Sequence, residues 1–218
     1  MLAAELRILV RPTPHLDLAA LAAELPRGDG HAVLALPAAL RADGLTREFQ
    51  SLLRRLGYLA HGWGLGLNLG PTRRLIDGCR SRLADLAAIH GPVSLVGFSM
   101  GGLFARFLAL EYPGLVRRVI TVASPFRAPL DSTALPRGFL ARLWGGDRVD
   151  MLAATLAKPL RVPATALYSR EDGVVAWEHC RDAGATADNV EYSGCHMTIV
   201  RNEGIMRTIA DRLARPLA

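Results

Sequence analysis

The sequence contains a single lysine, Lys158, so that nearly all of its positive charge is arginine. The 26 basic residues exceed the 20 acidic residues and leave a formal net charge of +6. The arginines are spread along the chain, and the longest basic runs are pairs such as Arg54-Arg55 and Arg117-Arg118. Nucleic-acid-binding proteins concentrate basic residues on one face or in one stretch. The sequence therefore predicts no nucleic-acid partner.

Cysteine is also scarce. Only Cys79, Cys180 and Cys195 are present, and no two of them have C-x-x-C spacing. Three unpatterned cysteines exclude a disulfide framework and the common zinc and redox motifs, and no other cluster of metal ligands is visible. We therefore expect reduced thiols, no bound metal and no cofactor.

Long apolar runs are missing as well. No segment approaches the ~18 consecutive apolar residues that suggest a transmembrane helix. Near the N-terminus, Glu5, Arg7 and Arg11 interrupt the apolar residues, whereas a secretion signal has a basic start and then a continuous apolar region. These two absences predict a cytoplasmic protein.

What the sequence does contain is enough apolar material for one buried core. The chain has 218 residues, of which 50% are hydrophobic, and a chain of this size commonly folds as one domain. We expect a single domain over residues 1–218, with no expectation for its oligomeric state. Residues 1–25 show helical apolar spacing and predict an N-terminal helical segment packed on the core. Contact of this segment with a lipid surface is a minor alternative.

Apolar strands alternate with amphipathic helices along the rest of the chain. We expect strands at 31–36, 58–61, 93–96, 116–122, 164–168 and 189–192, and helices at 45–56, 71–89, 100–112 and 199–213. This alternation predicts right-handed crossovers and a small, mostly parallel sheet with helices on both faces. One insertion at about 125–160, rich in proline and glycine, interrupts the alternation, and an insertion this long is usually a lid or a binding loop.

The segment 97–102 reads Gly-Phe-Ser-Met-Gly-Gly and fits G-x-S-x-G directly between an expected strand and an expected helix. A serine in such a sharp turn has a strained backbone, and the flanking glycines allow the close approach that the turn requires. Ser99 is therefore the candidate nucleophile. The backbone N–H of Met100, at the start of the next helix, is a candidate donor to an oxyanion. A glycine-rich turn with an incidental serine is the alternative for the pentapeptide alone.

A serine nucleophile needs a base, and the base needs an acid that orients it. Asp172 and His196 each follow the carboxyl end of an expected strand, and they come in the order serine, acid, histidine. Glu171 is the rival acid, but an aspartate followed by Gly173 suits a loop after a strand better. The sequence thus predicts a catalytic triad of Ser99, Asp172 and His196.

The five other histidines are not expected in this site. His31 and His90 lie before strands and therefore at the opposite edge of the sheet. His179 is expected on the surface of a helix after Asp172, and we expect structural roles for the last two, His15 and His61.

The second oxyanion donor should come from the loop after the first core strand. In the segment Pro37-Ala38-Ala39-Leu40, we predict the backbone N–H of Ala39 as this donor, with that of Leu40 as the alternative. Residues of this loop and apolar residues elsewhere are expected to line the substrate pocket, and the ones in the middle of the insertion fall on one helical face. The expected pocket residues are Ala38, Leu40, Trp63, Phe126, Leu135, Phe139, Leu143 and Trp144.

Taken together, these motifs resemble the α/β-hydrolase superfamily, and specifically bacterial hydrolases of the esterase/lipase family with a Gly-Trp-Gly-Leu-Gly segment after the second core strand. The resemblance covers about 28–200, and the segments that carry it are 34–37, 61–71, 97–102, 124–125, 172–173 and 194–196. It implies an α/β-hydrolase fold, the triad roles given above and ester hydrolysis. The chain departs from the family in having Pro37-Ala38-Ala39 in place of Pro-Gly and a bulky residue, and in having Leu67 where a polar or basic residue is usual.

The function expected is therefore that of an esterase that acts on short or medium acyl chains through an acyl-enzyme on Ser99. Its partner would be a small-molecule ester with a hydrophobic acyl or alcohol group. A lipase, a thioesterase or an acyltransferase would use the same triad, and the sequence does not separate them. A catalytically silent hydrolase fold that serves as a binding module is the alternative of another class. A dinucleotide-binding protein is disfavoured because G-x-G-x-x-G is absent.

Overall fold

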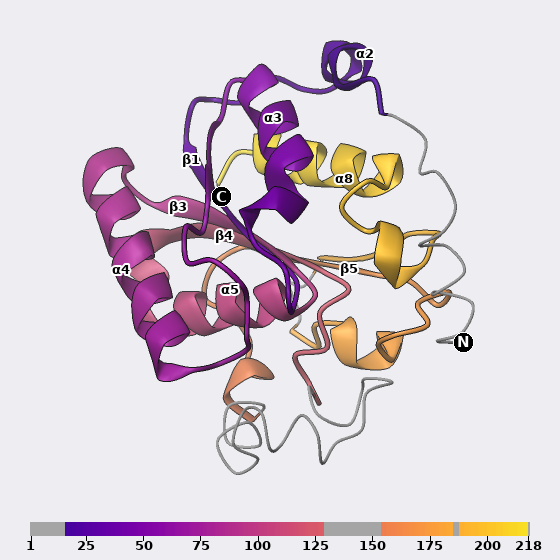
Figure 1. The fold of residues 1–218 in the computed structure, drawn as a ribbon. Helices are drawn as coiled ribbons and strands as arrows, with labels where there is room; N and C mark the ends of the chain where they lie inside the picture. The colour runs from indigo at the N-terminus through magenta and orange to yellow at the C-terminus, as the bar shows by residue number, and fades with distance from the viewer. Residues whose placement is uncertain (1–15, 129–153, 185–187, 218) are drawn as a thin grey trace.

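A computed structural model describes residues 16–128, 154–184 and 188–217 of the chain. Its centre is a six-stranded sheet with the strand order β2-β1-β3-β4-β5-β6, in which every strand is parallel to its neighbours (Figure 1). The strands are β1 (Ala32–Leu36), β2 (Leu59–Gly62), β3 (Val93–Phe98), β4 (Val116–Val122), β5 (Ala164–Tyr168) and β6 (Asp188–Glu191).

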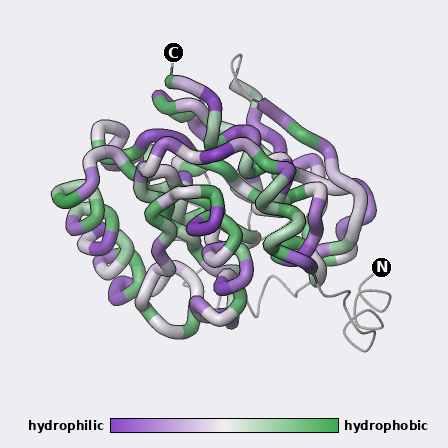
Figure 2. The backbone as a smooth tube through the Cα atoms, turned by 90° about the horizontal axis from the view of Figure 1, so that it is seen from above, coloured by the Kyte–Doolittle hydropathy of each residue, from purple (hydrophilic) through white to green (hydrophobic). Residues whose placement is uncertain are grey.

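Helices cover both faces of this sheet. One face packs against α2 (Leu18–Glu24), α3 (Arg47–Arg55) and α8 (Glu203–Ala214), and the other against α4 (Arg73–His90) and α5 (Met100–Glu111) (Figure 1). Successive side chains of β1 enter the two cores in turn, which explains why this strand is apolar throughout. Along the helices, green apolar residues and purple polar residues alternate in Figure 2, as expected for helices with one buried side. The expected parallel sheet with helices on both faces is confirmed.

Several element boundaries differ from the sequence-based expectation because polar side chains cap the helices. Helix α4 begins at Arg73 and not at Pro71, since the hydroxyl of Thr72 accepts a hydrogen bond from the N–H of Leu75. Helix α8 begins at Glu203 and not at 199, since the side chain of Asn202 caps it by accepting from the N–H of Ile205 at 3.1 Å.

Other boundaries differ by smaller amounts. Strand β3 continues two residues beyond its expected end, to Phe98. A 3-10 turn, Asp43–Thr46, precedes α3. The helix expected after Asp172 is a 3-10 turn, Trp177–Cys180, which contains His179.

Two expected regions lie partly outside the described residues. Of the N-terminal helical segment expected over 1–25, the structure describes only the part from residue 16, which contains α2. Of the insertion expected at about 125–160, residues 129–153 lie outside the described residues, and with them Leu135, Phe139, Leu140, Leu143 and Trp144. Within the described ranges, no helix has the length and apolar character needed to cross a membrane.

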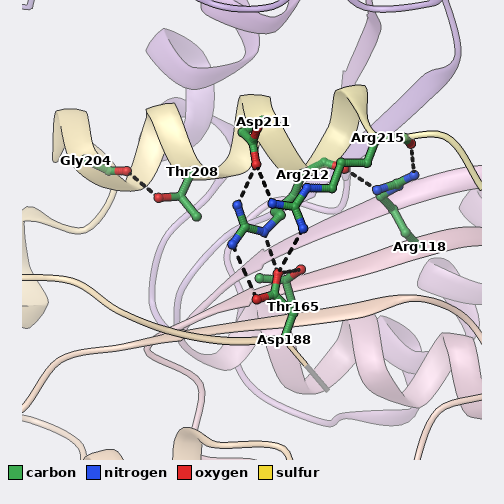
Figure 3. Close-up of polar contacts among 8 residues, drawn as sticks. All are labelled: Arg118, Thr165, Asp188, Gly204, Thr208, Asp211, Arg212 and Arg215. Carbon is green, nitrogen blue, oxygen red and sulfur yellow. Dashed lines mark hydrogen bonds and ion pairs between the residues drawn. The ribbon is translucent and has the colours of Figure 1, made fainter. Parts of the chain in front are cut away.

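Charged side chains fasten α8 to the sheet (Figure 3). The guanidinium of Arg212 binds the carboxylate of Asp188 on β6, and this hydrogen bond holds the pKa of Asp188 below its usual range. Arg118 of β4 donates to the backbone carbonyls of Arg212 and Arg215 at the end of α8. These carbonyls have no acceptor role inside the helix, so the arginine satisfies groups that the helix leaves open. The C-terminal end of α8 is thereby held next to the sheet.

A buried arginine joins the two ends of the insertion to the helix that follows Ser99. Arg106 on α5 donates from Nε to the carbonyl of Leu156 and from Nη2 to that of Lys158, both at 2.8 Å. Its third partner is the carboxylate of Asp182, and its guanidinium carbon lies 3.9 Å from the centre of the Phe126 ring. Phe126 precedes and Leu156 follows the segment 129–153. Arg106 therefore organises the base of this insertion.

Replacing Arg106 with methionine is expected to lower the free energy of unfolding by about 3–5 kcal/mol, because the carboxylate of Asp182 stays buried without its cation. Chemical denaturation measures this loss. Arg80→Met is the matched control, because Arg80 pairs with Glu111 near the surface, and such pairs contribute about 1 kcal/mol or less. Equal losses of free energy of unfolding in the two variants would show that the buried ion pair contributes no more to stability than the surface pair.

Candidate active site

The three residues predicted to form the triad lie together at the edge of the sheet where the strands have their carboxyl ends. Ser99 follows β3 directly, Asp172 lies in the loop after β5, and His196 lies in the loop after β6. Nε2 of His196 lies 3.0 Å from Oγ of Ser99, and Nδ1 of His196 lies 2.7 Å from Oδ2 of Asp172. The three side chains thus form one continuous chain of hydrogen bonds, although they are far apart in the sequence.

The backbone at Ser99 has the strained conformation that the motif predicts. Its φ is 51° and its ψ is −118°, a region that residues other than glycine rarely adopt. The N–H of Ser99 donates to the carbonyl of Val122 on the neighbouring strand at 2.7 Å, which helps to hold the turn. A Cβ at Gly101 would overlap with the carbonyl oxygen of Leu36, and one at Gly97 would overlap with the backbone of Gly101. Both glycines of the motif are therefore needed for the approach of strand and helix.

Asp172 is held by its own loop. Its side chain is buried, and Oδ1 accepts hydrogen bonds from the N–H groups of Val174 and Val175, each at 2.9 Å. The other oxygen, Oδ2, faces the imidazole of His196. The rival acid, Glu171, instead accepts from the N–H of Gly194 at 2.8 Å. Glu171 therefore fastens the loop that carries His196, and Asp172 contacts the imidazole itself.

The two predicted oxyanion donors follow the carboxyl ends of neighbouring strands, β3 and β1. Met100 is the first residue of α5, where a backbone N–H has no acceptor inside the helix. Ala39 lies in the turn after β1, in which the N–H of Arg41 donates to the carbonyl of Ala38 at 3.2 Å. The N–H of Leu40, the alternative donor, is already bound to the carbonyl of Asn68 at 2.8 Å. Of the two candidates in this turn, Ala39 therefore stays the prediction.

The structure places two of the expected pocket residues in the hydrophobic core. Trp63 and Phe126 are each 1% exposed. The indole N–H of Trp63 donates to the carbonyl of Gly66, and its ring packs against Phe104. Both side chains are therefore packed in the core, Trp63 with its indole N–H satisfied by the backbone. The other four pocket residues given above for the insertion lie outside the described residues.

Ala38 and Leu40 lie on the turn after β1, where the expected pocket begins. Ala38 is half-buried and Leu40 is 64% exposed. Leu40 has a φ of 58°, so that this turn, like the turn at Ser99, contains a strained residue other than glycine. The turn must therefore be held from outside.

Sequence reasoning missed two polar residues that organise these loops. Asp43 accepts hydrogen bonds from the N–H groups of Trp63 and Gly64, at 2.8 and 3.0 Å, and holds the start of the glycine-rich loop after β2. Asn68, later in the same loop, is 0% exposed. An amide side chain between Leu67 and Leu69 is the one signal in the sequence that could have identified a buried polar contact at this position.

A second serine, histidine and aspartate also form a chain of hydrogen bonds, at the opposite edge of the sheet. Oγ of Ser94 lies 2.8 Å from Nε2 of His31, and Nδ1 of His31 contacts the carboxylate of Asp29. Ser94 is 0% exposed in the interior of β3, so no substrate can reach its hydroxyl. Burial lowers the pKa of His31, against the opposing effect of Asp29. This set is structural, as expected for a histidine at the amino end of a strand.

The described residues offer neither a metal centre nor a reactive thiol beside Asp172. In these parts of the chain, no three histidine, cysteine, aspartate or glutamate side chains are grouped so that they could hold a metal ion. Burial, together with the charges of Asp172 and Glu178, raises the pKa of the Cys180 thiol. A protonated thiol is a poor nucleophile, so Ser99 has no competitor in Cys180.

Comparisons with known proteins agree with this architecture. A family model for the alpha/beta hydrolase fold matches residues 85–171, a range that includes Ser99. A comparison with curated protein sequences gives no match.

Similar solved structures include one reported for LipS and LipT, two metagenome-derived lipolytic enzymes, with a TM-score of 0.65 and 16% identity over 86% of this chain and 93% of that chain. Alpha/beta hydrolase domain-containing protein 10 from mouse has a TM-score of 0.59 and 17% identity over 87% and 93% of the two chains. The thioesterase domain from the curacin biosynthetic pathway has a TM-score of 0.57 and 16% identity over 88% and 93%. At these identities the likeness shows the fold.

Proposed function

This chain has the α/β-hydrolase fold, and we propose that on this fold it acts as a serine hydrolase that cleaves carboxylic esters. The observation that carries the proposal is the chain of hydrogen bonds from Ser99 Oγ through His196 to Asp172, with distances of 3.0 and 2.7 Å. These distances lie within the range at which a base can take a proton from a nucleophile.

In the proposed mechanism, Nε2 of His196 takes the proton from Ser99 as Oγ attacks the acyl carbon. Asp172 holds the imidazole in the required tautomer and stabilises its positive charge. The N–H groups of Met100 and Ala39 donate to the oxyanion of the tetrahedral intermediate. The imidazolium then gives its proton to the departing alcohol, and an acyl group stays on Ser99. Water, activated by His196, hydrolyses this acyl-enzyme and restores the serine.

We propose short or medium acyl chains as the preferred substrates, with a hydrophobic acyl or alcohol group. Leucine side chains of the turn after β1 and of the glycine-rich loop after β2 support this choice, because Leu40, Leu67 and Leu69 are exposed by 64%, 55% and 43%. Apolar groups at the entrance of a site favour apolar ligands. A thioester is the second candidate substrate, since a similar structure is a thioesterase domain and a thioester would need the same three residues.

Labelling with a fluorophosphonate probe tests the proposal directly. We expect covalent modification of the wild-type protein at Ser99 and none at Ser94, because of these two serines Ser99 is half-buried beside its base and Ser94 is fully buried. Mass spectrometry of the modified peptide identifies the serine. A folded protein that takes up no label and hydrolyses no p-nitrophenyl ester would favour the silent binding module.

The substrate class is tested separately. Values of kcat/KM for p-nitrophenyl esters of increasing chain length, and for matched acyl thioesters, give the order of preference. Faster turnover of the thioesters would identify a thioesterase, and a maximum at long chains would identify a lipase. Transfer of the acyl group to an added alcohol in place of water would identify an acyltransferase.

A further inference from the structure

Asn68 connects the glycine-rich loop after β2 to the turn after β1. Its side-chain Nδ2 donates to the carbonyl of Pro37 at 2.7 Å, and its Oδ1 accepts from the N–H of Gly70 at 3.1 Å. Its backbone carbonyl accepts from the N–H of Leu40, and its backbone N–H donates to the carbonyl of Arg41, both at 2.8 Å. One fully buried residue thus binds the turn at three points.

These contacts lie on both sides of the predicted oxyanion donor. The carbonyl of Pro37 belongs to the peptide unit before Ala38, and the N–H of Leu40 belongs to the unit after Ala39. Asn68 therefore fixes the two peptide units that flank the Ala38–Ala39 unit. That middle unit carries the N–H of Ala39, which is the donor that the mechanism requires.

The middle peptide unit is oriented by the turn itself. The N–H of Arg41 donates to the carbonyl of Ala38 at 3.2 Å. In a trans peptide the N–H points away from the carbonyl of the same unit, so the N–H of Ala39 is turned away from Arg41. Among the residues that the structure describes, this N–H has no hydrogen-bond acceptor. It is therefore free to donate to a bound group.

The departure of this chain from its family pattern fits the same arrangement. The family that the sequence resembles usually has glycine after this proline, whereas this chain has Ala38, and the Cβ of alanine restricts rotation of the peptide unit that follows it. Leu40, at a φ of 58°, would relax to another conformation without support. Asn68 supplies that support from a separate loop.

We propose that Asn68 is a positioning residue of the oxyanion hole, which holds the N–H of Ala39 in the direction that stabilises the tetrahedral intermediate. The inference rests on the proposed function, because it requires an oxyanion to form on Ser99. Oxyanion donors act through their fixed geometry, and a displacement of about 1 Å costs about 100-fold in rate.

The test compares Asn68→Ala with the wild type on a p-nitrophenyl ester and on an alkyl trifluoromethyl ketone. The ketone forms a tetrahedral adduct when Oγ of Ser99 adds to its carbonyl carbon and the proton passes to His196. For the variant we expect kcat to fall about 100-fold with KM changed by less than about threefold, because the lost stabilisation belongs to the transition state. The inhibition constant of the ketone should rise by the same factor.

Asn189→Ala is the matched control. The side chain of Asn189 also makes two hydrogen bonds to backbone groups, with the N–H and the carbonyl of Asp182, but it lies on β6 away from the turn. We expect this variant to lose a similar amount of stability and to keep kcat and the inhibition constant within about threefold of the wild type, since it leaves the donor in place. A role of Asn68 in stability alone would give the same kinetics in both variants.

A second substitution covers the case in which Asn68→Ala does not fold. Asn68→Asp preserves the shape of the side chain and the acceptor for Gly70, but an ionised carboxylate cannot donate to the carbonyl of Pro37. Asn68→Asp should lower kcat and raise the inhibition constant of the ketone by the same factor. Asn189→Asp should leave both values within about threefold of the wild type. A folded Asn68 variant with unchanged kcat overturns the inference, and so does a loss of kcat without weaker binding of the ketone. A wild-type protein that takes no fluorophosphonate label overturns the proposed function instead.

Discussion

Replacing Ser99 with alanine is expected to lower kcat for a p-nitrophenyl ester by about a million-fold, the scale seen when a triad nucleophile is removed. The variant retains the turn, the two oxyanion donors and the imidazole, but no atom is left to form the acyl-enzyme. Fluorophosphonate labelling should disappear together with turnover. Steady-state kinetics and labelling of the purified variant measure both effects.

The fold should survive this substitution, because the hydroxyl of Ser99 has the imidazole of His196 as its partner and the backbone hydrogen bonds of the turn do not involve it. Ser94→Ala is the matched control, since it removes the hydroxyl that contacts His31. We expect this control to keep its activity and its label. Turnover that persists in Ser99→Ala would exclude Ser99 as the nucleophile.

Replacing Asp172 with asparagine is expected to lower kcat by about 10⁴-fold with the fold intact. The amide oxygen can still accept from Val174 and Val175, so the loop keeps its shape. The amide nitrogen, however, would face Nδ1 of His196, where the carboxylate now accepts a hydrogen bond. The imidazole would then favour the wrong tautomer and lose the charge that stabilises its protonated form.

Glu171→Gln is the control for this prediction. A glutamine oxygen can still accept from the N–H of Gly194, so we expect kcat to fall by less than about tenfold, as for a residue that acts on the imidazole only through its loop. Parallel measurements of kcat and of thermal unfolding separate loss of catalysis from loss of structure. If Glu171→Gln were the more damaging substitution, the assignment of Asp172 as the acid would be wrong.

The sequence was sufficient to predict the layered architecture, because the relevant signals are local. Strands β4 and β5 are short runs rich in apolar and β-branched residues that begin within two residues of Gly114 and Pro163, and their observed limits match the expected ones. Ser99, Asp172 and His196 could be proposed together because Ser99 directly follows an expected strand, the other two lie in the loops after expected strands, and parallel strands bring their carboxyl ends to one edge.

The contacts that hold the loops could not be predicted in the same way. Asn68 reaches Pro37, and Arg106 reaches Leu156 and Asp182, across loops whose paths the sequence does not encode in any repeating pattern. The predicted start of a helix differs from the observed one where a capping side chain sets the boundary, as Thr72 does for α4. The burial of Trp63 depends on a partner ring from α5, Phe104, and pairing of this kind has no signature in either segment alone.

The hydrogen-bonded set of Ser94, His31 and Asp29 has a practical consequence for recognising enzymes by shape. Within the described residues, a template that searches for these three side-chain types at hydrogen-bonding distance would find two sets, one at each edge of the sheet. Only one of the two matches has its hydroxyl at the end of a strand, where a reactant can arrive. Templates of this kind therefore become selective when they also require that solvent reaches the serine hydroxyl and that the serine has a positive φ, as Ser99 does.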